Sequence, residues 1–185
     1  MSRLLGFSIC LLCLAACNPR QHRQTLADLA PSGFVVLDST AGHLNGDTLQ
    51  DLILVLKNPH EDSISQAGDT TVQRPLLIFL RQPDGTLQLS ARSDNAVYCI
   101  SCGGVMGDPF QGISILGNKF SVLHYGGSAL RWSRTITFIY NDGAWWLHDD
   151  ALQSFDVDDN DDGIIEHQHA EDYDKQSFLA FDIYR

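Results

Sequence analysis

The chain has 185 residues, of which 44% are hydrophobic, and it carries 23 Asp and Glu against 12 Lys and Arg, a formal net charge of −11. This length and apolar content suffice for one domain with a buried core. An acidic chain without a basic stripe repels phosphates, so nucleic acid is excluded as a partner. Anionic lipid head groups do not attract such a chain electrostatically either.

The first seventeen residues predict a secreted precursor that receives a lipid anchor. An apolar stretch from Leu4 to Ala16 is too short to cross a bilayer but fits the h-region of a signal peptide. It ends in a leucine, two alanines and Cys17, which resembles the bacterial lipobox. The resemblance implies that residues 1–16 are removed, that Cys17 is acylated and that Asn18 directs the protein to the outer membrane. The alternative is an ordinary signal peptide next to an unrelated cysteine.

The remaining residues predict a tether followed by one all-β domain. Residues 17–32 form the tether, with a short helical turn at 25–30 that Pro31 and Gly33 end. In residues 33–185 nearly every apolar run is short, β-branched or aromatic, and bounded by turn residues. We expect antiparallel hairpins arranged as propeller-blade-like sheets or as a β-sandwich. The expected strands are 34–38, 52–57, 76–81, 87–92, 113–116, 120–125, 131–140, 144–148 and 177–184.

Turn residues and charge locate the connections between these strands. The Asn141-Asp142-Gly143 sequence predicts a tight hairpin between strands 131–140 and 144–148. Residues 58–73 are polar and predict a loop. Residues 149–174 hold 11 of the 23 acidic residues and predict an acidic excursion before the last strand.

Two cysteines remain once the signal peptide is removed and Cys17 is acylated. Cys99 and Cys102 have C-x-x-C spacing, which in an oxidising compartment favours a structural disulfide that shapes a turn. A thioredoxin-like redox pair is the alternative, and it requires a helix N-terminus after a strand. Two glycines follow Cys102 and favour a loop. A zinc site needs two further ligands, and no second cysteine pair exists.

One segment of the acidic excursion has the spacing of a calcium loop. Such loops place side-chain oxygens at positions 1, 3 and 5, a glycine at 6, a backbone carbonyl at 7 and an acid or water further on. His169 stands where an EF-hand has its bidentate Glu, so a full EF-hand is disfavoured. The alternative is a solvated acidic loop. The candidate calcium ligands are Asp158, Asn160, Asp162, Ile164 and Glu166.

A second calcium-type spacing lies in residues 42–55. Ligand positions 3, 5, 7 and 9 are filled by Asn45, Asp47, the Leu49 carbonyl and Asp51. The segment resembles the loop of FG-GAP/VCBS repeats, the blade repeats of integrin alpha propellers. It departs from that motif at His43, in place of the first Asp, and at Thr48, in place of the turn glycine. Both departures weaken a hard-cation site, so backbone amides bonded to Asn45 and Asp47 are an alternative way to hold the loop.

The resemblance extends along the chain. Motifs at 74–79, 99–110, 124–128 and 131–140 are similar to a group of uncharacterised bacterial lipoproteins with one FG-GAP-like loop. The similarity covers about residues 25–148. It implies a fold and an envelope location, and it implies no activity.

Two further combinations that contain histidine are weaker candidates. His167 and His169, beside acidic residues, offer nitrogen ligands to zinc, copper or nickel, although exposed histidines in an acidic loop are the simpler explanation. His124 and Ser128 are residue types of a hydrolytic triad. No Gly-x-Ser-x-Gly elbow accompanies them, and a tight turn at Gly126-Gly127 explains the segment equally well.

Tryptophans suggest a binding surface. Trp132, Trp145 and Trp146 are candidates for a carbohydrate-stacking platform, and strand alternation places Trp145 and Trp146 on opposite faces. Because no catalytic set is recognisable, we expect a lipid-anchored, non-enzymatic binding module with calcium as a candidate cofactor. Its expected partners are the membrane, through the anchor, and an envelope protein or glycan. The alternatives are a periplasmic hydrolase or metal-dependent enzyme, and a thiol–disulfide protein that uses Cys99 and Cys102.

Overall fold

The chain folds into strands joined by short connections, which confirms the all-β prediction. The computed structural model describes residues 24–66, 72–157, 164–169 and 176–184, and for 164–169 it describes the backbone alone. The helices are α1 (Leu26–Leu29) and α2 (Glu61–Gln66). The strands are β1 (Val35–Gly42), β2 (Asp51–Lys57), β3 (Leu76–Arg81), β4 (Leu87–Ser93), β5 (Phe110–Leu116), β6 (Lys119–Gly127), β7 (Leu130–Asn141), β8 (Ala144–Asp156) and β9 (Ile164–His169).

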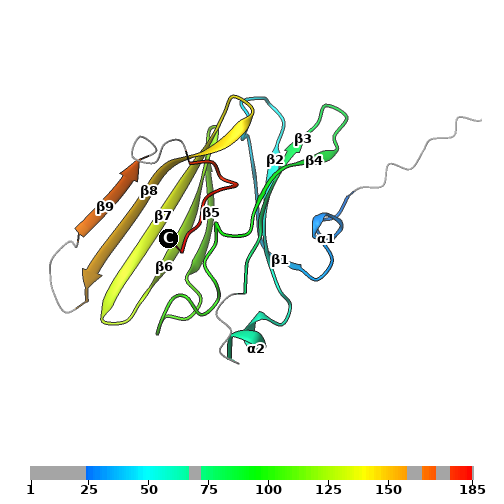
Figure 1. The fold of residues 1–185 in the computed structure, drawn as a ribbon. Coiled ribbons are helices and arrows are strands. Elements are labelled where there is room, and N and C mark those ends of the chain that lie inside the picture. The colour runs from blue at the N-terminus through cyan, green and yellow to red at the C-terminus, as the bar shows by residue number, and fades with distance from the viewer. Residues whose placement is uncertain (1–23, 67–71, 158–163, 170–175, 185) are drawn as a thin grey trace, which may run out of the picture.

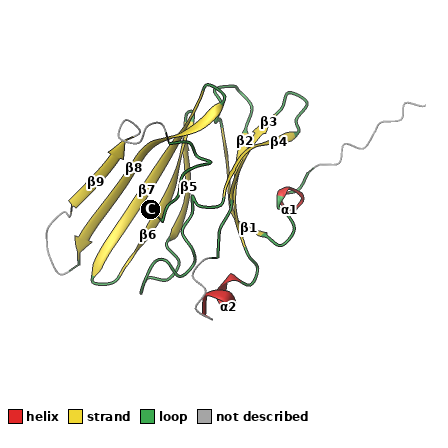
Figure 2. Cartoon of the chain, viewed as in Figure 1, coloured by secondary structure: helices red, strands yellow, loops and turns green. Residues whose placement is uncertain are grey.

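The strands form two antiparallel sheets (Figures 1 and 2). The four-stranded sheet has the order β1-β2-β3-β4 and the five-stranded sheet the order β5-β6-β7-β8-β9, so each strand pairs with its neighbour in the chain. The β7–β8 hairpin turns at Asp142 and Gly143, which both have positive φ, 50° and 79°. That conformation is the one a two-residue hairpin requires, and it confirms the turn predicted from the Asn-Asp-Gly sequence.

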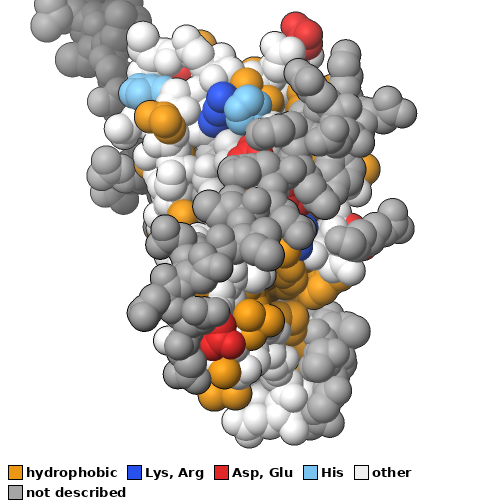
Figure 3. All heavy atoms as spheres, turned by 90° about the vertical axis from the view of Figure 1, so that its left-hand side faces the viewer, with side chains coloured by type: hydrophobic (Ala, Val, Ile, Leu, Met, Phe, Trp, Pro, Cys, Tyr) orange, Lys and Arg blue, Asp and Glu red, His pale blue; other side chains and the backbone are white. Residues whose placement is uncertain are grey.

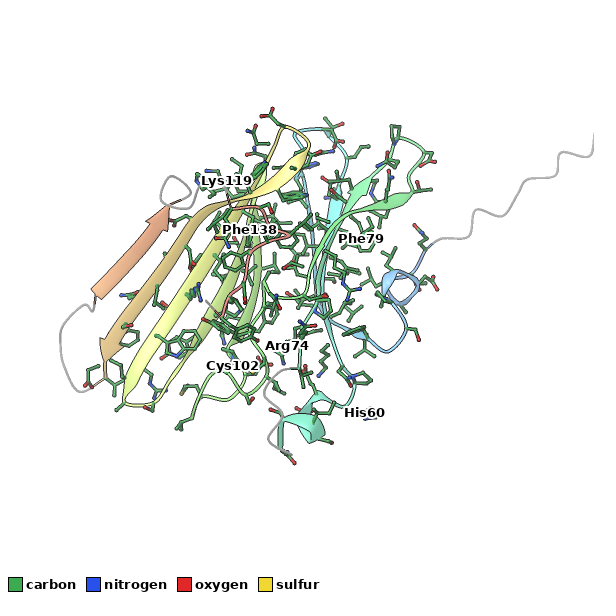
Figure 4. All side chains as sticks on the ribbon, in the orientation of Figure 1. His60, Arg74, Phe79, Cys102, Lys119 and Phe138 are labelled. Carbon is green, nitrogen blue, oxygen red and sulfur yellow. A yellow bond between two sulfur atoms is a disulfide. The ribbon has the colours of Figure 1, made fainter. Side chains whose placement is uncertain are left out.

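The main core lies between the two sheets, and this makes the fold a β-sandwich. Residues of β6 alternate between half-buried and fully buried positions along the strand, as expected for a sheet with one face on the core. Phe120 and Phe138 stack at 5.3 Å between ring centroids and meet Ile53 and Ile78 from the opposite sheet. Figure 4 shows Phe138 between the sheets.

The four-stranded sheet is covered on its second face as well. Leu54, Leu56 and Phe79 form a smaller apolar cluster there, packed against Leu29 and Phe34 from the N-terminal segment. Burial on both faces explains why β2 is continuously apolar instead of alternating. The helix α1 is held by a capping box between Thr25 and Asp28. Helix α1 confirms the predicted helical turn.

Three segments differ from the sequence-based expectation. Strand β8 continues to Asp156, and β9 occupies Ile164–His169, so much of the expected acidic excursion is sheet. The expected strand 177–184 is wrong: Ser177 makes one isolated bridge to Trp146, and the segment then runs irregularly over the inner face of the five-stranded sheet. Its apolar residues at 178, 181 and 183 do not alternate, because they fill the core instead of a sheet face. Helix α2 lies within the expected loop 58–73.

The described residues hold no helix with the length and apolar character needed to cross a membrane.

Candidate functional site

The loop between β1 and β2, residues 43–51, is closed by hydrogen bonds within the protein. The Nδ1 atom of His43 lies 3.0 Å from the carbonyl oxygen of Leu49. Asn45 Nδ2 donates to Asp47 Oδ2 at 2.8 Å, and the Leu49 amide donates to Asp47 Oδ1 at 2.7 Å. The histidine at ligand position 1 therefore contacts the carbonyl at ligand position 7 directly, whereas in calcium loops of this spacing the ion joins these two positions.

Asp51, the last candidate ligand of this loop, is a buried structural residue. Its side chain is fully buried, and its two oxygens accept the amides of Leu44 and Arg81, each at 2.9 Å. These bonds join the loop to the end of β3. Every candidate ligand of residues 43–51 thus has a protein partner, and these hydrogen bonds close the loop. Within the described residues, no three His, Cys, Asp or Glu side chains gather closely enough to hold a metal.

A disulfide joins Cys99 and Cys102, as expected from their spacing. The pair lies in a turn and not at the start of a helix, so it lacks the helix dipole that the redox alternative requires. The Cys99 amide donates to the hydroxyl of Tyr184 at 3.1 Å, and Gly127 donates to the Gly103 carbonyl at 2.9 Å. The disulfide loop is therefore tied to both the C-terminal segment and β6.

A fully buried arginine joins α2 to the segment after the disulfide. Arg74 donates through Nε and Nη2 to both oxygens of Glu61, at 3.0 and 2.7 Å, and through Nη1 and Nη2 to Asp108, at 2.6 and 2.7 Å. Burial alone would lower the pKa of Arg74, but the hydrogen bonds that it donates to Asp108 and Glu61 raise the pKa above its ordinary value. The guanidinium is therefore charged and bound to two carboxylates.

A second buried arginine organises the inner face of the five-stranded sheet. Arg134 on β7 makes a bidentate pair with Asp150 on β8, with distances of 2.9 and 2.7 Å. Its Nη1 donates to the Tyr98 hydroxyl at 2.6 Å and to the carbonyl of Ile183 at 2.8 Å. This network explains how an acidic residue of the expected excursion, Asp150, comes to be buried.

His124 is enclosed beside this network. Its side chain is 2% exposed, and its Nε2 accepts the Tyr98 amide at 3.4 Å. Burial, together with the positive charges of Arg134 and Arg74, lowers the pKa of His124 to about 3, and Asp108 acts in the opposite direction. A histidine with this pKa is a poor general base near neutral pH. Ser128 lies on the exposed turn after β6, four residues from His124 and about 13 Å along the chain, so the two residues do not form a catalytic pair.

A pocket of about 340 Å³, with both polar and apolar surface, lies on the outer face of the five-stranded sheet, the face turned away from the four-stranded sheet. Ser121 on β6 and Thr137 on β7 face each other there with 2.8 Å between their hydroxyl oxygens. Lys119 Nζ lies 2.7 Å from His148 Nε2, and because an ammonium only donates, the imidazole accepts. The residues that line this outer-face pocket are Leu116, Lys119, Ser121, Thr137, His148 and Asp149.

The sequence analysis did not predict the outer-face pocket, although the sequence of β8 contains one sign of it. Along β8, alternation continues to Leu147 and then breaks, because Phe138 pairs with Leu147 and Thr137 with Asp149. His148 is therefore the extra residue of a β-bulge, and two side chains of β8 stand opposite Thr137. The sign in the sequence is the run of three polar residues His148, Asp149 and Asp150 within β8.

A second groove, of about 400 Å³, separates α2 from the disulfide loop. Asp62, Ser65 and Asp108 are among its lining residues. Asp108 is already bound to Arg74, so the groove has less capacity for a ligand than its residue types suggest.

Several predicted site residues lie outside the described part of the chain. These are the lipidation site Cys17 and the calcium candidates Asp158, Asn160 and Asp162. Ile164 and Glu166 belong to β9, whose backbone pairs with β8. The candidate ligands His167 and His169 lie at positions of β9 opposite Ala151 and Asp149.

Comparison with family models, curated proteins and solved structures finds no match to this chain.

Proposed function

We propose that this protein is a lipid-anchored component of the bacterial envelope that acts as a non-enzymatic binding module. One observation supports the proposed binding role. The buried groups with catalytic potential in the described residues are enclosed or held in structural contacts, whereas the polar side chains of the outer-face pocket, which bond to one another, line a hollow at the surface. Arg74, Arg134 and Asp150 are held in ion pairs, and His124 is enclosed. The proposed envelope location is supported by the lipobox resemblance at Cys17 and by the N-terminal apolar stretch.

The anchor predicts a clear fractionation result. Two or three acyl chains on Cys17 contribute about 0.8 kcal/mol for each buried methylene group, enough to hold the protein on a membrane. We expect the wild-type protein in the outer-membrane fraction with residues 1–16 removed, and the Cys17→Ala variant either soluble or retained as an uncleaved precursor that still carries residues 1–16. Cys13→Ala is the matched control, because Cys13 leaves with the signal peptide, and it should fractionate as wild type. Mass spectrometry that finds residues 1–16 attached, or an unmodified Cys17, contradicts the proposal.

Binding itself is tested by recovering partners from envelope extracts with the purified lipidated protein in detergent. Recovery of a defined protein or glycan supports the module. A measurable turnover of ester, peptide or glycosidic substrates by the same preparation favours the enzyme alternatives instead.

We further propose that calcium, where it stabilises this protein, binds at residues 158–166 and not at residues 43–51. The support is the closed hydrogen bonding of the 43–51 loop together with the ligand spacing of 158–166. Millimolar calcium should raise the Tm, since a ligand that binds only the folded state stabilises it. Asp162→Asn should abolish this rise, and Asp47→Asn should preserve it. A rise that depends on Asp47 contradicts the assignment.

A further inference from the structure

The register of the five-stranded sheet assembles two rows of side chains on its outer face. Ser121 pairs with Thr137, and Thr137 pairs with Asp149, so these three residues form a polar row across β6, β7 and β8. Because directly opposed residues in antiparallel strands share a face, the next row is Lys119, Ile139 and Trp146. Three consecutive strands, joined by two hairpin turns, thus contribute to one surface.

The β-bulge adds His148 to this surface. Without the extra residue, strict alternation would leave one side chain of β8 opposite Thr137. The bulge places His148 and Asp149 together there, and His148 reaches Lys119 across the sheet. Bulges often re-aim side chains next to functional sites, so the bulge is an observation separate from the pocket itself. Figure 3 shows the side of the molecule nearest β9, where basic and histidine side chains lie together.

We propose that the outer-face pocket binds a saccharide, which identifies the ligand class of the binding module proposed above and rests on that function. A sugar presents several hydroxyl groups that both donate and accept. The pocket has the matching mixture: an ammonium donor, two hydroxyls that donate or accept, an imidazole, and a carboxylate acceptor. Its volume lies at the lower end of the range for small-molecule sites.

The remaining features favour a sugar over other small ligands. A free anion is disfavoured, because Asp149 lines the pocket and the whole chain has a net charge of −11. A purely apolar ligand is disfavoured, because Leu116 is the one aliphatic side chain in the lining. The C–H face of a sugar ring is apolar and packs on aromatic surfaces. Trp146 lies outside the pocket lining but on the same face of the sheet, beyond Ile139 in the row that contains Lys119, and its Nε1 donates to the carbonyl of Asn141 at 3.3 Å.

The test is a screen of the full-length lipidated protein in detergent against an array of neutral hexoses, N-acetylhexosamines, uronic acids and their oligomers. Hits are titrated by calorimetry with the wild-type protein and with pocket variants. Thr137→Val removes one hydroxyl at nearly constant volume, and we expect affinity to fall about 2–10-fold. Lys119→Met removes a charged donor, and we expect a fall of roughly 10–100-fold.

Thr135→Val is the matched control. Thr135 lies on the same strand and the same face as Thr137, opposite Ala151, and is outside the pocket lining. Its substitution should leave affinity within about twofold, and Thr137→Ser, which keeps the hydroxyl, should retain binding close to wild type. Thermal melts of all variants establish that they are folded.

Three outcomes would overturn the saccharide site: no saccharide binds the folded protein, affinity is equal for Thr137→Val and Thr135→Val, or inorganic phosphate and free carboxylates bind where sugars do not. Failure of the wider function looks different. If the envelope extract yields a specific protein partner and no sugar binds, the binding module stands and the saccharide site falls. If neither a partner nor a sugar is found, both fall.

Discussion

Replacing Arg74 with methionine is expected to lower the free energy of unfolding by about 3–5 kcal/mol, because it leaves a buried carboxylate without its counter-charge. Glu61 is 1% exposed and makes two of its hydrogen bonds to Arg74. Lys57 lies 3.7 Å from Glu61 but is partly exposed, and it is too distant to replace both bonds. Asp108 would lose its bidentate partner at the same time. Urea titration measures the loss, with the slope of the transition checked for constancy.

Arg92→Met provides the control for the Arg74 prediction. Arg92 also pairs with a carboxylate, Asp94, at 2.7 Å, but the two side chains are 39% and 37% exposed. Exposed pairs contribute at most about 1 kcal/mol, so this variant should differ little from wild type. Combining Arg74→Met with Glu61→Gln and Asp108→Asn should recover part of the lost stability, since the buried charge is then removed. A similar loss of unfolding free energy for Arg74→Met and Arg92→Met would show that the buried ion pair contributes no more to stability than the exposed one.

Local patterns were sufficient to predict most of the strands. The boundaries of β3 and the β7–β8 turn follow from alternation and from the Asn141-Asp142-Gly143 sequence, and both are properties of a few consecutive residues. The second half of β8 could not be predicted in the same way. Its acidic residues resemble a solvated loop, and Asp150 is buried only because Arg134 reaches it from the neighbouring strand. That pairing is not visible in any short window of sequence.

The C-terminal segment shows the opposite error. Its apolar residues predicted a strand, but Phe178 packs edge-on against Phe120 and Phe138, with ring centroids 5.9 and 5.0 Å apart. The apolar content correctly indicated burial. It did not distinguish a strand from an irregular segment that fills the space between two sheets.

The candidate sites also differ in whether a short stretch of sequence could reveal them. The loop at residues 43–51 was found because its residues are consecutive, and the direct contact from His43 to Leu49 became visible only in three dimensions. The outer-face pocket draws on β5, β6, β7 and β8, so no motif could identify it. The run of polar residues His148, Asp149 and Asp150 was its one local sign.

His124 is expected to make the protein lose stability in acid. The pKa of His124 is about 3 in the folded protein, against an ordinary value of 6.5, so between these values the unfolded chain binds a proton that the folded chain does not. Stability is therefore fully present above pH 6.5 and decreases as the pH falls, by at most about 1.4 kcal/mol per pH unit. Over the whole interval the loss amounts to roughly 4–5 kcal/mol. The cause is burial first, and then the positive charges of Arg134 and Arg74, which outweigh Asp108.

Carboxylates also titrate in this interval, so the contribution of His124 has to be isolated by difference. His124→Gln keeps an acceptor for the Tyr98 amide but has no titrating group, and it should flatten the dependence of unfolding free energy on pH between 6.5 and 4. His60→Gln is the control, because His60 is exposed and makes its backbone bond to Asn58 in either case. The carboxylates titrate in the same way in the wild type and in both variants, so their contribution to the pH dependence cancels in the comparison. Equal pH slopes for wild type and His124→Gln would mean that His124 takes up a proton in the folded protein without cost, and that the Arg134 network opens to accommodate it.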